Sequence, residues 1–92
     1  MPLRPPPTPM LQAFVCAART GSFARAATEL NLTASAISHQ ISGLEAWWNV
    51  QLFERHSRGV KLTSAGEALL PVTDTVFTGL EGVMHSLNQG KS

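Results

Sequence analysis

The chain has 92 residues, enough for one small domain, and its hydrophobic content of 43% is typical of a folded protein. A single cysteine, Cys16, excludes an intrachain disulfide and is predicted to be a small, partly buried side chain; the histidines, His39, His56 and His85, lack metal-ligand spacing. No stretch approaches the ~18 apolar residues of a membrane span, and the start, MPLRPPPTP, lacks the apolar segment of a signal peptide. We therefore expect a cytoplasmic domain with no cofactor, no metal and no membrane contact.

The net charge of +1 is unevenly distributed along the chain. Residues 1–62 carry six Lys and Arg against three acidic residues, a balance of +3, whereas residues 63–92 carry one Lys against three acidic residues, a balance of −2. The positive first part favours a polyanionic partner such as nucleic acid, although the signal is modest.

Residues 1–8 are predicted to form a flexible arm, because three consecutive prolines exclude a helix and supply no backbone donors. Thr8 and Pro9 then suit the N-cap and first position of a helix that Gly21 ends. The apolar residues of this helix recur at helical spacing: Leu11, Phe14, Val15 and Ala18. We expect the helix to be scaffold, with Arg19 more often a solvated charge than a phosphate ligand.

Two further helices are predicted to form a helix-turn-helix at residues 23–42. Ser22 is a good N-cap for the first, and Thr33 is a second N-cap after the apolar period is interrupted. Two helices joined by a turn of three to four residues have this arrangement. Ala26 and Ala27 allow the helices to approach, because larger side chains would hold them apart.

Residues 33–48, TASAISHQISGLEAWW, combine an apolar face with an opposite face of small, hydroxylated side chains, and residues 30–44 carry no formal charge. Such a face suits the DNA major groove, ~12 Å wide, where short donors and acceptors can reach base edges and a carboxylate would be repelled by phosphate. The alternative is a core helix with a Ser-rich exposed face, since small residues also line helix–helix contacts.

This third helix is expected to end near Trp48, with Asn49 in the left-handed conformation. Trp48 continues the apolar stripe and is predicted to lie in the core. For Trp47 we favour a side chain lying flat on the surface, with a partner surface or a lid over apolar neighbours as the functional alternatives.

Residues 52–62 are predicted to form a small β hairpin, or wing, whose turn contains Gly59 at a positive φ. Beside a recognition helix, basic residues on such a hairpin can hold the DNA backbone or enter the minor groove. Three basic residues lie in it: Arg55, Arg58 and Lys61. Glu54 is expected to pair within the domain.

Residues 64–88 are predicted to form a long last helix, with a frayed end at residues 89–92. Thr63 or Ser64 caps it, and Ser64 and Glu67 have the spacing of a capping box. Pro71 lies inside the helix and is expected to bend it.

The apolar residues of this last helix form a heptad seam with one polar member, Thr73. The apolar members are Leu69, Val76, Leu80, Val83 and Leu87. A helix of roughly 25 residues spans about 37 Å, longer than the rest of the domain can cover. The exposed seam therefore predicts a partner.

Residues 21–71 resemble the amino-terminal domain of LysR-type bacterial transcriptional regulators, through SF-x-x-AA-x-x-L, S-A-I-S-H-Q-I, L-E, L-F-x-R and L-T-x-A-G in this order. The resemblance implies an all-α winged helix-turn-helix with a small β wing, residues 9–63, followed by a linker helix. It implies sequence-specific binding of double-stranded DNA by a homodimer whose linker helices pack antiparallel. A small-molecule effector would act only through a C-terminal domain that is absent here.

The resemblance also implies which side chains read bases: Ala34, Ser35, Ser38 and His39. Thr33 would cap the helix and could touch a phosphate. The sequence departs from the family pattern at Ala34, where Gln is frequent; alanine can contact a thymine methyl but cannot form a hydrogen bond with a base. His39 stands where Arg is also common.

No motif suggests catalysis, because the chain has no nucleophile elbow, no P-loop spacing and no cluster of carboxylates. The competing function is a protein-binding module that uses residues 64–88, with the helix-turn-helix as scaffold. Salt-dependent affinity for DNA distinguishes the two.

Overall fold

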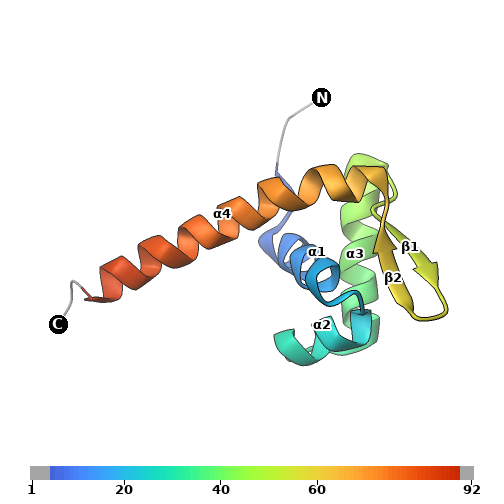
Figure 1. Ribbon diagram of the computed structural model, residues 1–92, viewed down its shortest axis with the longest axis horizontal. Helices are drawn as coiled ribbons and strands as arrows, with labels where there is room; N and C mark the ends of the chain where they lie inside the picture. The colour runs from blue at the N-terminus through green and yellow to red at the C-terminus, as the bar shows by residue number, and fades with distance from the viewer. Residues whose placement is uncertain (1–4, 90–92) are drawn as a thin grey trace.

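The structure is a computed structural model that describes residues 5–89, which fold into four helices and one β hairpin (Figure 1). The elements are α1 (Thr8–Thr20), α2 (Phe23–Leu30), α3 (Ala34–Trp48), β1 (Phe53–His56), β2 (Gly59–Leu62) and α4 (Ser64–Gln89). The first three helices and the hairpin form the body, and α4 crosses the body and projects beyond it (Figure 1). The predicted class, an all-α domain with a small β wing, is confirmed.

The ends of α2 and α3 follow the predicted local chemistry. The Ser22 hydroxyl accepts from the Arg25 N–H at 3.2 Å, and the Thr33 hydroxyl accepts from the Ala36 N–H at 3.0 Å. Asn49 ends α3 in the left-handed conformation, with φ 52°. These N-caps satisfy amides that have no partner within the helix.

The start of the chain differs from the prediction. α1 begins at Thr8, so Pro7 is the N-cap, and the Pro7 carbonyl accepts from the Met10 N–H at 3.1 Å. Pro6 is buried, so this part of the predicted arm packs on the body. Residues 1–4 of the arm lie outside the described residues.

The core lies between α1, α2, α3 and the start of β1. Its largest fully buried side chains are Phe14, Ile37, Leu44 and Leu52. Ala26 and Ala27 are buried, as the helix-turn-helix requires. The Phe53 ring packs on the rings of Phe14 and Phe23, with centroids 5.5 and 5.6 Å apart. This aromatic cluster joins the wing to the helices.

Trp48 is not in the core, where the sequence placed it, because 41% of its surface is exposed. Leu44 is the last buried residue of α3, and Trp48 lines an open apolar groove beside the first turns of α4. Trp47 is 37% exposed, which agrees with its predicted surface position.

The hairpin has Phe53 opposite Leu62 and His56 opposite Gly59. Gly59 has the predicted positive φ, at 143°. The neighbouring Val60 N–H donates to the Gly21 carbonyl at 3.1 Å, so the wing is attached to the α1–α2 turn.

Thr63, and not Ser64, caps α4: its hydroxyl accepts from the Gly66 N–H at 3.2 Å. The capping box predicted for Ser64 and Glu67 is therefore not formed, because Thr63 shifts the cap by one residue. The helix continues through Pro71 to Gln89, so Gln89 is not part of a frayed end as predicted. The other residues of that predicted end, 90–92, lie outside the described residues.

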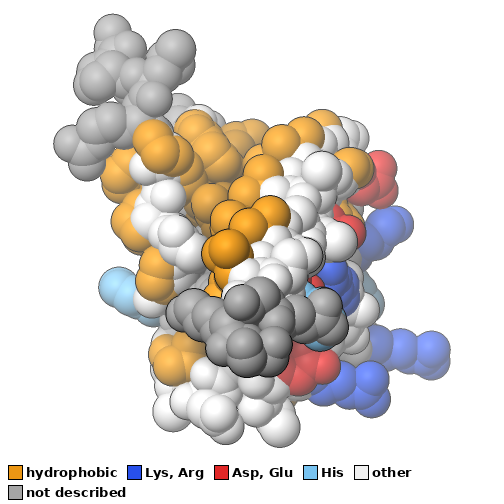
Figure 2. Space-filling view, turned by 90° about the vertical axis from the view of Figure 1, so that its left-hand side faces the viewer, with side chains coloured by type: hydrophobic (Ala, Val, Ile, Leu, Met, Phe, Trp, Pro, Cys, Tyr) orange, Lys and Arg blue, Asp and Glu red, His pale blue; other side chains and the backbone are white. Residues whose placement is uncertain are grey.

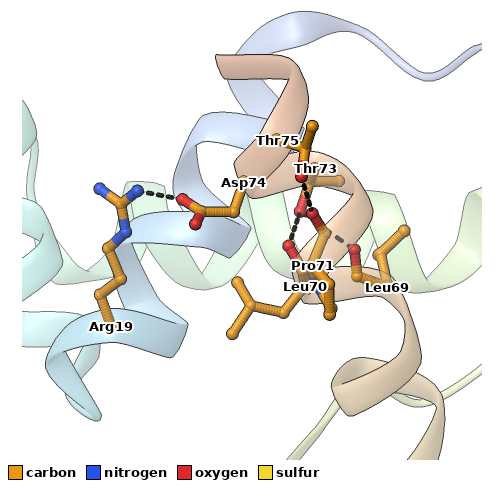
Figure 3. Close-up of polar contacts among 7 residues, drawn as sticks. All are labelled: Arg19, Leu69, Leu70, Pro71, Thr73, Asp74 and Thr75. Atoms are coloured by element: carbon orange, nitrogen blue, oxygen red, sulfur yellow. Dashed lines mark hydrogen bonds and ion pairs between the residues drawn. The ribbon is translucent and has the colours of Figure 1, made fainter. Parts of the chain in front are cut away.

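The side of α4 that faces the body includes Leu69, Leu70 and Phe77, which pack against the core. Thr73, beside Leu69 and Leu70, is buried (Figure 3). The Thr73 hydroxyl donates to the Leu69 and Leu70 carbonyls, at 3.2 and 3.1 Å, so its burial leaves no polar group unsatisfied. The first part of the predicted seam thus contacts the chain's own core.

Arg19 is not a lone solvated charge, because it forms an ion pair with Asp74 of α4 (Figure 3). The pair joins the end of α1 to α4. Among residues 5–89, no helix has the length and hydropathy to cross a membrane.

Candidate nucleic-acid interface

The start of α3 presents an exposed, uncharged surface. Thr33, Ala34, Ser35 and His39 are exposed and Ser38 is half-buried, while Ile37, Ile41 and Leu44 point into the core from the other side. The predicted division into a buried apolar face and a small polar face is confirmed. Short side chains at this surface allow the helix to approach a groove closely and to form hydrogen bonds there. Longer side chains would fill the groove.

Arg55 of the wing joins the hairpin to α3. Its Nη2 donates to the Ser38 Oγ at 2.8 Å, and its guanidinium carbon lies 5.1 Å from the centroid of the Phe23 ring. A cation over an aromatic face at an exposed site contributes about 0.5–1 kcal/mol. Ser38 of α3 and Arg55 of the wing, which lie in separate elements, therefore form one cluster with Phe23 of α2.

Arg58 and Lys61 are exposed on the same hairpin, Arg58 in its turn and Lys61 on β2. Glu54 faces Lys61 in the strand register, yet it is exposed and makes no ion pair within the part of the chain that the structure describes. The expected internal pairing of Glu54 is wrong, because exposed side chains gain little from such a pair.

Positive charge and apolar surface are separated on the molecule. In the view of Figure 2, hydrophobic side chains follow the helix that points toward the viewer, whereas Lys and Arg side chains lie along the right-hand edge. A polyanion and an apolar partner would therefore meet different faces.

Glu45 positions the wing, a role that the sequence analysis missed. Its carboxylate Oε2 accepts from the Leu52 N–H at 2.7 Å and from the Phe53 N–H at 3.3 Å. These charge-assisted bonds fix the start of β1 against the last turns of α3. The available signal was that Glu45 is the first charge after Glu29 in the sequence.

Cys16 is not a reactive site. Its buried thiol donates to the Glu29 carboxylate at 2.8 Å. Burial, reinforced by this hydrogen bond and by the charge of Glu29, raises the pKa of the Cys16 thiol from 9.0 to about 11. The thiolate, which is the nucleophile, is therefore scarce at neutral pH.

No cluster of three or more His, Cys, Asp or Glu that could hold a metal ion occurs among residues 5–89.

A helix-turn-helix with an exposed polar helix and an attached basic hairpin is a winged helix-turn-helix of the DNA-binding kind. The model of the family described as bacterial regulatory helix-turn-helix protein, lysR family, matches residues 9–67. The chain belongs to this family, and it is a LysR-type DNA-binding domain of a transcription regulator. The family is one of regulators and not of enzymes.

Two curated relatives have high identity to the chain. It is 51% identical over 78 residues to the HTH-type transcriptional activator AmpR of Citrobacter freundii, covering 85% of this chain and 27% of that protein. It is 48% identical over 75 residues to the HTH-type transcriptional regulator PerR of Escherichia coli (strain K12), covering 82% and 25%. The chain thus spans about a quarter of the length of these relatives.

Solved structures of protein–DNA complexes share the fold. The CbnR_DBD–DNA complex superposes with a TM-score of 0.79 at 32% identity, covering 92% of this chain and 97% of that one. The complex of BenM_DBD with benA site 1 DNA gives 0.83 at 28% identity, covering 95% and 98%.

Proposed function

We propose that this domain binds a specific site on double-stranded DNA as a homodimer in the bacterial cytoplasm. The observation that carries the proposal is the cluster of Arg55, Ser38 and Phe23, which holds the wing in place beside the exposed start of α3. A helix and a hairpin fixed in this way can engage a major groove and the adjoining backbone together.

The proposed contacts divide by chemistry. Residues at the start of α3 face the base edges: Ala34, Ser35, Ser38 and His39. Residues around them contact phosphate or the minor groove: Thr33, Arg55, Arg58 and Lys61. This division is supported by the exposure of the short side chains on α3 and of the long basic ones on the wing.

Dimerisation through α4 is supported by apolar side chains that are more than half exposed on its projecting part. They are Val76, Leu80, Val83, Met84 and Leu87. Such a stripe on a small domain marks an interaction site. In a longer regulator, an effector would act through a further domain and change the relative position of the two DNA-binding units.

The dimer is tested by Leu80→Lys, which places like charges in an apolar contact between two copies and should give monomers in sedimentation. Thr78→Lys adds the same charge at an exposed position on the other side of α4 and should leave the dimer intact. A dimer that persists in Leu80→Lys would contradict the assignment of α4.

DNA binding is tested by selecting bound duplexes from a random pool at two salt concentrations. A two-fold motif with affinity that falls as salt rises is the expected result. Absence of an enriched motif together with salt-independent binding would favour the second candidate, a protein-binding module, which the exposed apolar side chains of α4 support.

A further inference from the structure

The second strand of the wing contacts the α1–α2 turn through backbone atoms. The Val60 N–H donates to the Gly21 carbonyl at 3.1 Å. Gly59 lies so close to the same carbonyl that a Cβ atom on Gly59 would collide with its oxygen, well inside the 3.0 Å that Cβ atoms keep from other atoms in proteins. Gly59 also has φ 143°, a conformation that L side chains rarely adopt. The approach of β2 to the turn therefore requires glycine at position 59.

The Gly21 carbonyl is held in place by the end of α1. Gly21 has φ 69°, and its N–H donates to the Ala17 carbonyl at 2.9 Å, which ends the helix. The Ser22 N–H donates to the Thr20 hydroxyl at 3.3 Å within the same turn. The acceptor that receives the wing thus belongs to a turn with hydrogen bonds of its own, so a displaced wing would leave it behind.

This contact and the Arg55 cluster hold the hairpin at the same level. Arg55 of β1 lies opposite Val60 of β2 in the strand register. Arg55 bonds to Ser38 of α3 and lies over the Phe23 ring of α2. Val60 bonds to the turn between α1 and α2. Both strands are therefore attached to the helices at one cross-strand pair.

Arg58 lies just beyond this attached level. The next cross-strand pair is His56 with Gly59, and Ser57 and Arg58 form the turn between them. Because Gly59 follows Arg58 directly, a shift of the Gly59 backbone away from the α1–α2 turn would move Arg58 with it. The position of an exposed cation thus depends on a contact that carries no charge.

We propose that Gly59 is a positioning residue for DNA binding. Its lack of a side chain lets the wing approach the α1–α2 turn, and this approach places Arg58 at the DNA backbone. Gly59 acts through Arg58 and not by a contact of its own with DNA. This role rests on the proposed function, in which Arg58 contacts a phosphate, and adds the residue that sets where that contact is made.

The test compares two glycine-to-alanine substitutions in the full chain. Gly59→Ala adds a Cβ atom that collides with the Gly21 carbonyl, so the wing must shift. Gly21→Ala is the matched control, because alanine is also strained at φ 69° but its Cβ would lie 4.0 Å from the Val60 oxygen, an ordinary contact. Both variants should lose stability in urea denaturation, whereas only Gly59→Ala should change how the folded domain binds DNA.

The readout is the affinity for a duplex that carries the selected site, measured at a series of salt concentrations. Gly59→Ala should lower the slope of log affinity against log salt by up to about 2, the value of two phosphate contacts in a dimer. Gly21→Ala should leave the slope unchanged. Unfolding alone lowers the active fraction, which a stoichiometric titration measures, and does not change the number of counterions that the folded domain releases.

Val60→Pro tests the same contact without a Cβ atom at position 59. The Val60 N–H points out of the hairpin toward Gly21, so proline removes this hydrogen bond and none between the strands. It should lower the salt slope as Gly59→Ala does, which keeps the test decisive if Gly59→Ala does not fold.

A double variant shows whether Gly59 acts through Arg58. Gly59→Ala combined with Arg58→Ala should bind DNA within about twofold of Arg58→Ala alone, because the position of Arg58 has no effect once its side chain is removed. Additive losses in the double variant would overturn the positioning role.

The salt slopes separate the failure of this role from the failure of the proposed function. A lowered slope in Arg58→Ala with unchanged slopes in Gly59→Ala and Val60→Pro would overturn the role of Gly59 and leave DNA binding by the wing standing. Affinity of the unchanged chain that does not vary with salt would overturn the proposed function, and the role of Gly59 with it.

Discussion

Ser38 is an acceptor toward Arg55, and this leaves its hydroxyl with one hydrogen and one further lone pair for DNA. Its oxygen accepts the Arg55 Nη2–H at 2.8 Å, so its own hydroxyl hydrogen stays available to donate. A donor selects an acceptor on the base edge, such as guanine N7 or O6 or thymine O4.

Ser38→Ala should therefore abolish the preference at one base pair and weaken the preferred site by roughly fivefold to a hundredfold, or about 1–3 kcal/mol. Both effects are measured by the affinity of the two proteins for duplexes in which each base pair of the site is replaced in turn. An unchanged base preference in Ser38→Ala would show that Ser38 does not contact a base edge.

Cys16 makes the stability of the domain sensitive to alkaline pH. Its folded pKa, about 11, lies above the unfolded value near 9.0, so its contribution is complete below pH 9 and is lost as the pH rises through 11. The loss is on the order of 2 kcal/mol.

Cys16→Ser retains a donor for Glu29 without a group that titrates in this range. Its free energy of unfolding should fall less between pH 8 and pH 10.5 than that of the unchanged chain, as measured by urea denaturation. Parallel curves for the two proteins would indicate that the thiol is not linked to folding.

At the scale of elements, Glu45 connects α3 to the wing. Glu45→Ala leaves the Leu52 and Phe53 amides without their acceptor and should destabilise the domain by about 2 kcal/mol, as measured by denaturation. Glu54→Ala removes an exposed carboxylate of the wing that makes no ion pair among the described residues, and it should change stability by less than about 0.5 kcal/mol. Equal effects of the two substitutions would exclude a specific role for Glu45.

The elements could be predicted from the sequence because their ends depend on local chemistry. Ser22, Thr33 and Asn49 act within three residues of their own position, and each was placed correctly. Contacts between elements depend on where side chains point after folding. The bonds of Glu45 to the wing and of Arg19 to Asp74 join residues that no periodicity relates, so these partners could not be predicted from spacing.

The same limit applies to the candidate site. The exposed face of α3 and the basic wing followed from composition and spacing, but the support of Arg55 by Phe23 did not. The apolar periodicity of α3 also predicted, wrongly, that Trp48 lies in the core. Periodicity identifies which face of a helix is apolar, but not how much of the length of that face the rest of the domain covers.

At the scale of the whole molecule, the charge distribution predicts which arginines act on DNA. Arg58 is exposed in the turn of the wing and makes no ion pair with any of residues 5–89, whereas Arg19 is paired with Asp74. Both are exposed arginines of the same small domain. Of these two arginines, only Arg58 has a charge that no carboxylate of the described residues neutralises, so we expect it to displace a counterion from a phosphate.

Arg58→Ala should weaken binding to specific and random duplexes alike, because a backbone contact carries no sequence information. In a dimer it removes two phosphate contacts, so the slope of log affinity against log salt should fall by about 2. Arg19→Ala is the matched control and should leave the slope unchanged, with a stability loss of at most about 1 kcal/mol from the exposed ion pair. Fluorescence anisotropy titrations between 50 and 300 mM salt would measure all three proteins. An unchanged slope in Arg58→Ala would mean that the turn of the wing does not reach the DNA backbone, and an equal fall in Arg19→Ala would mean that the ion pair with Asp74 opens on binding.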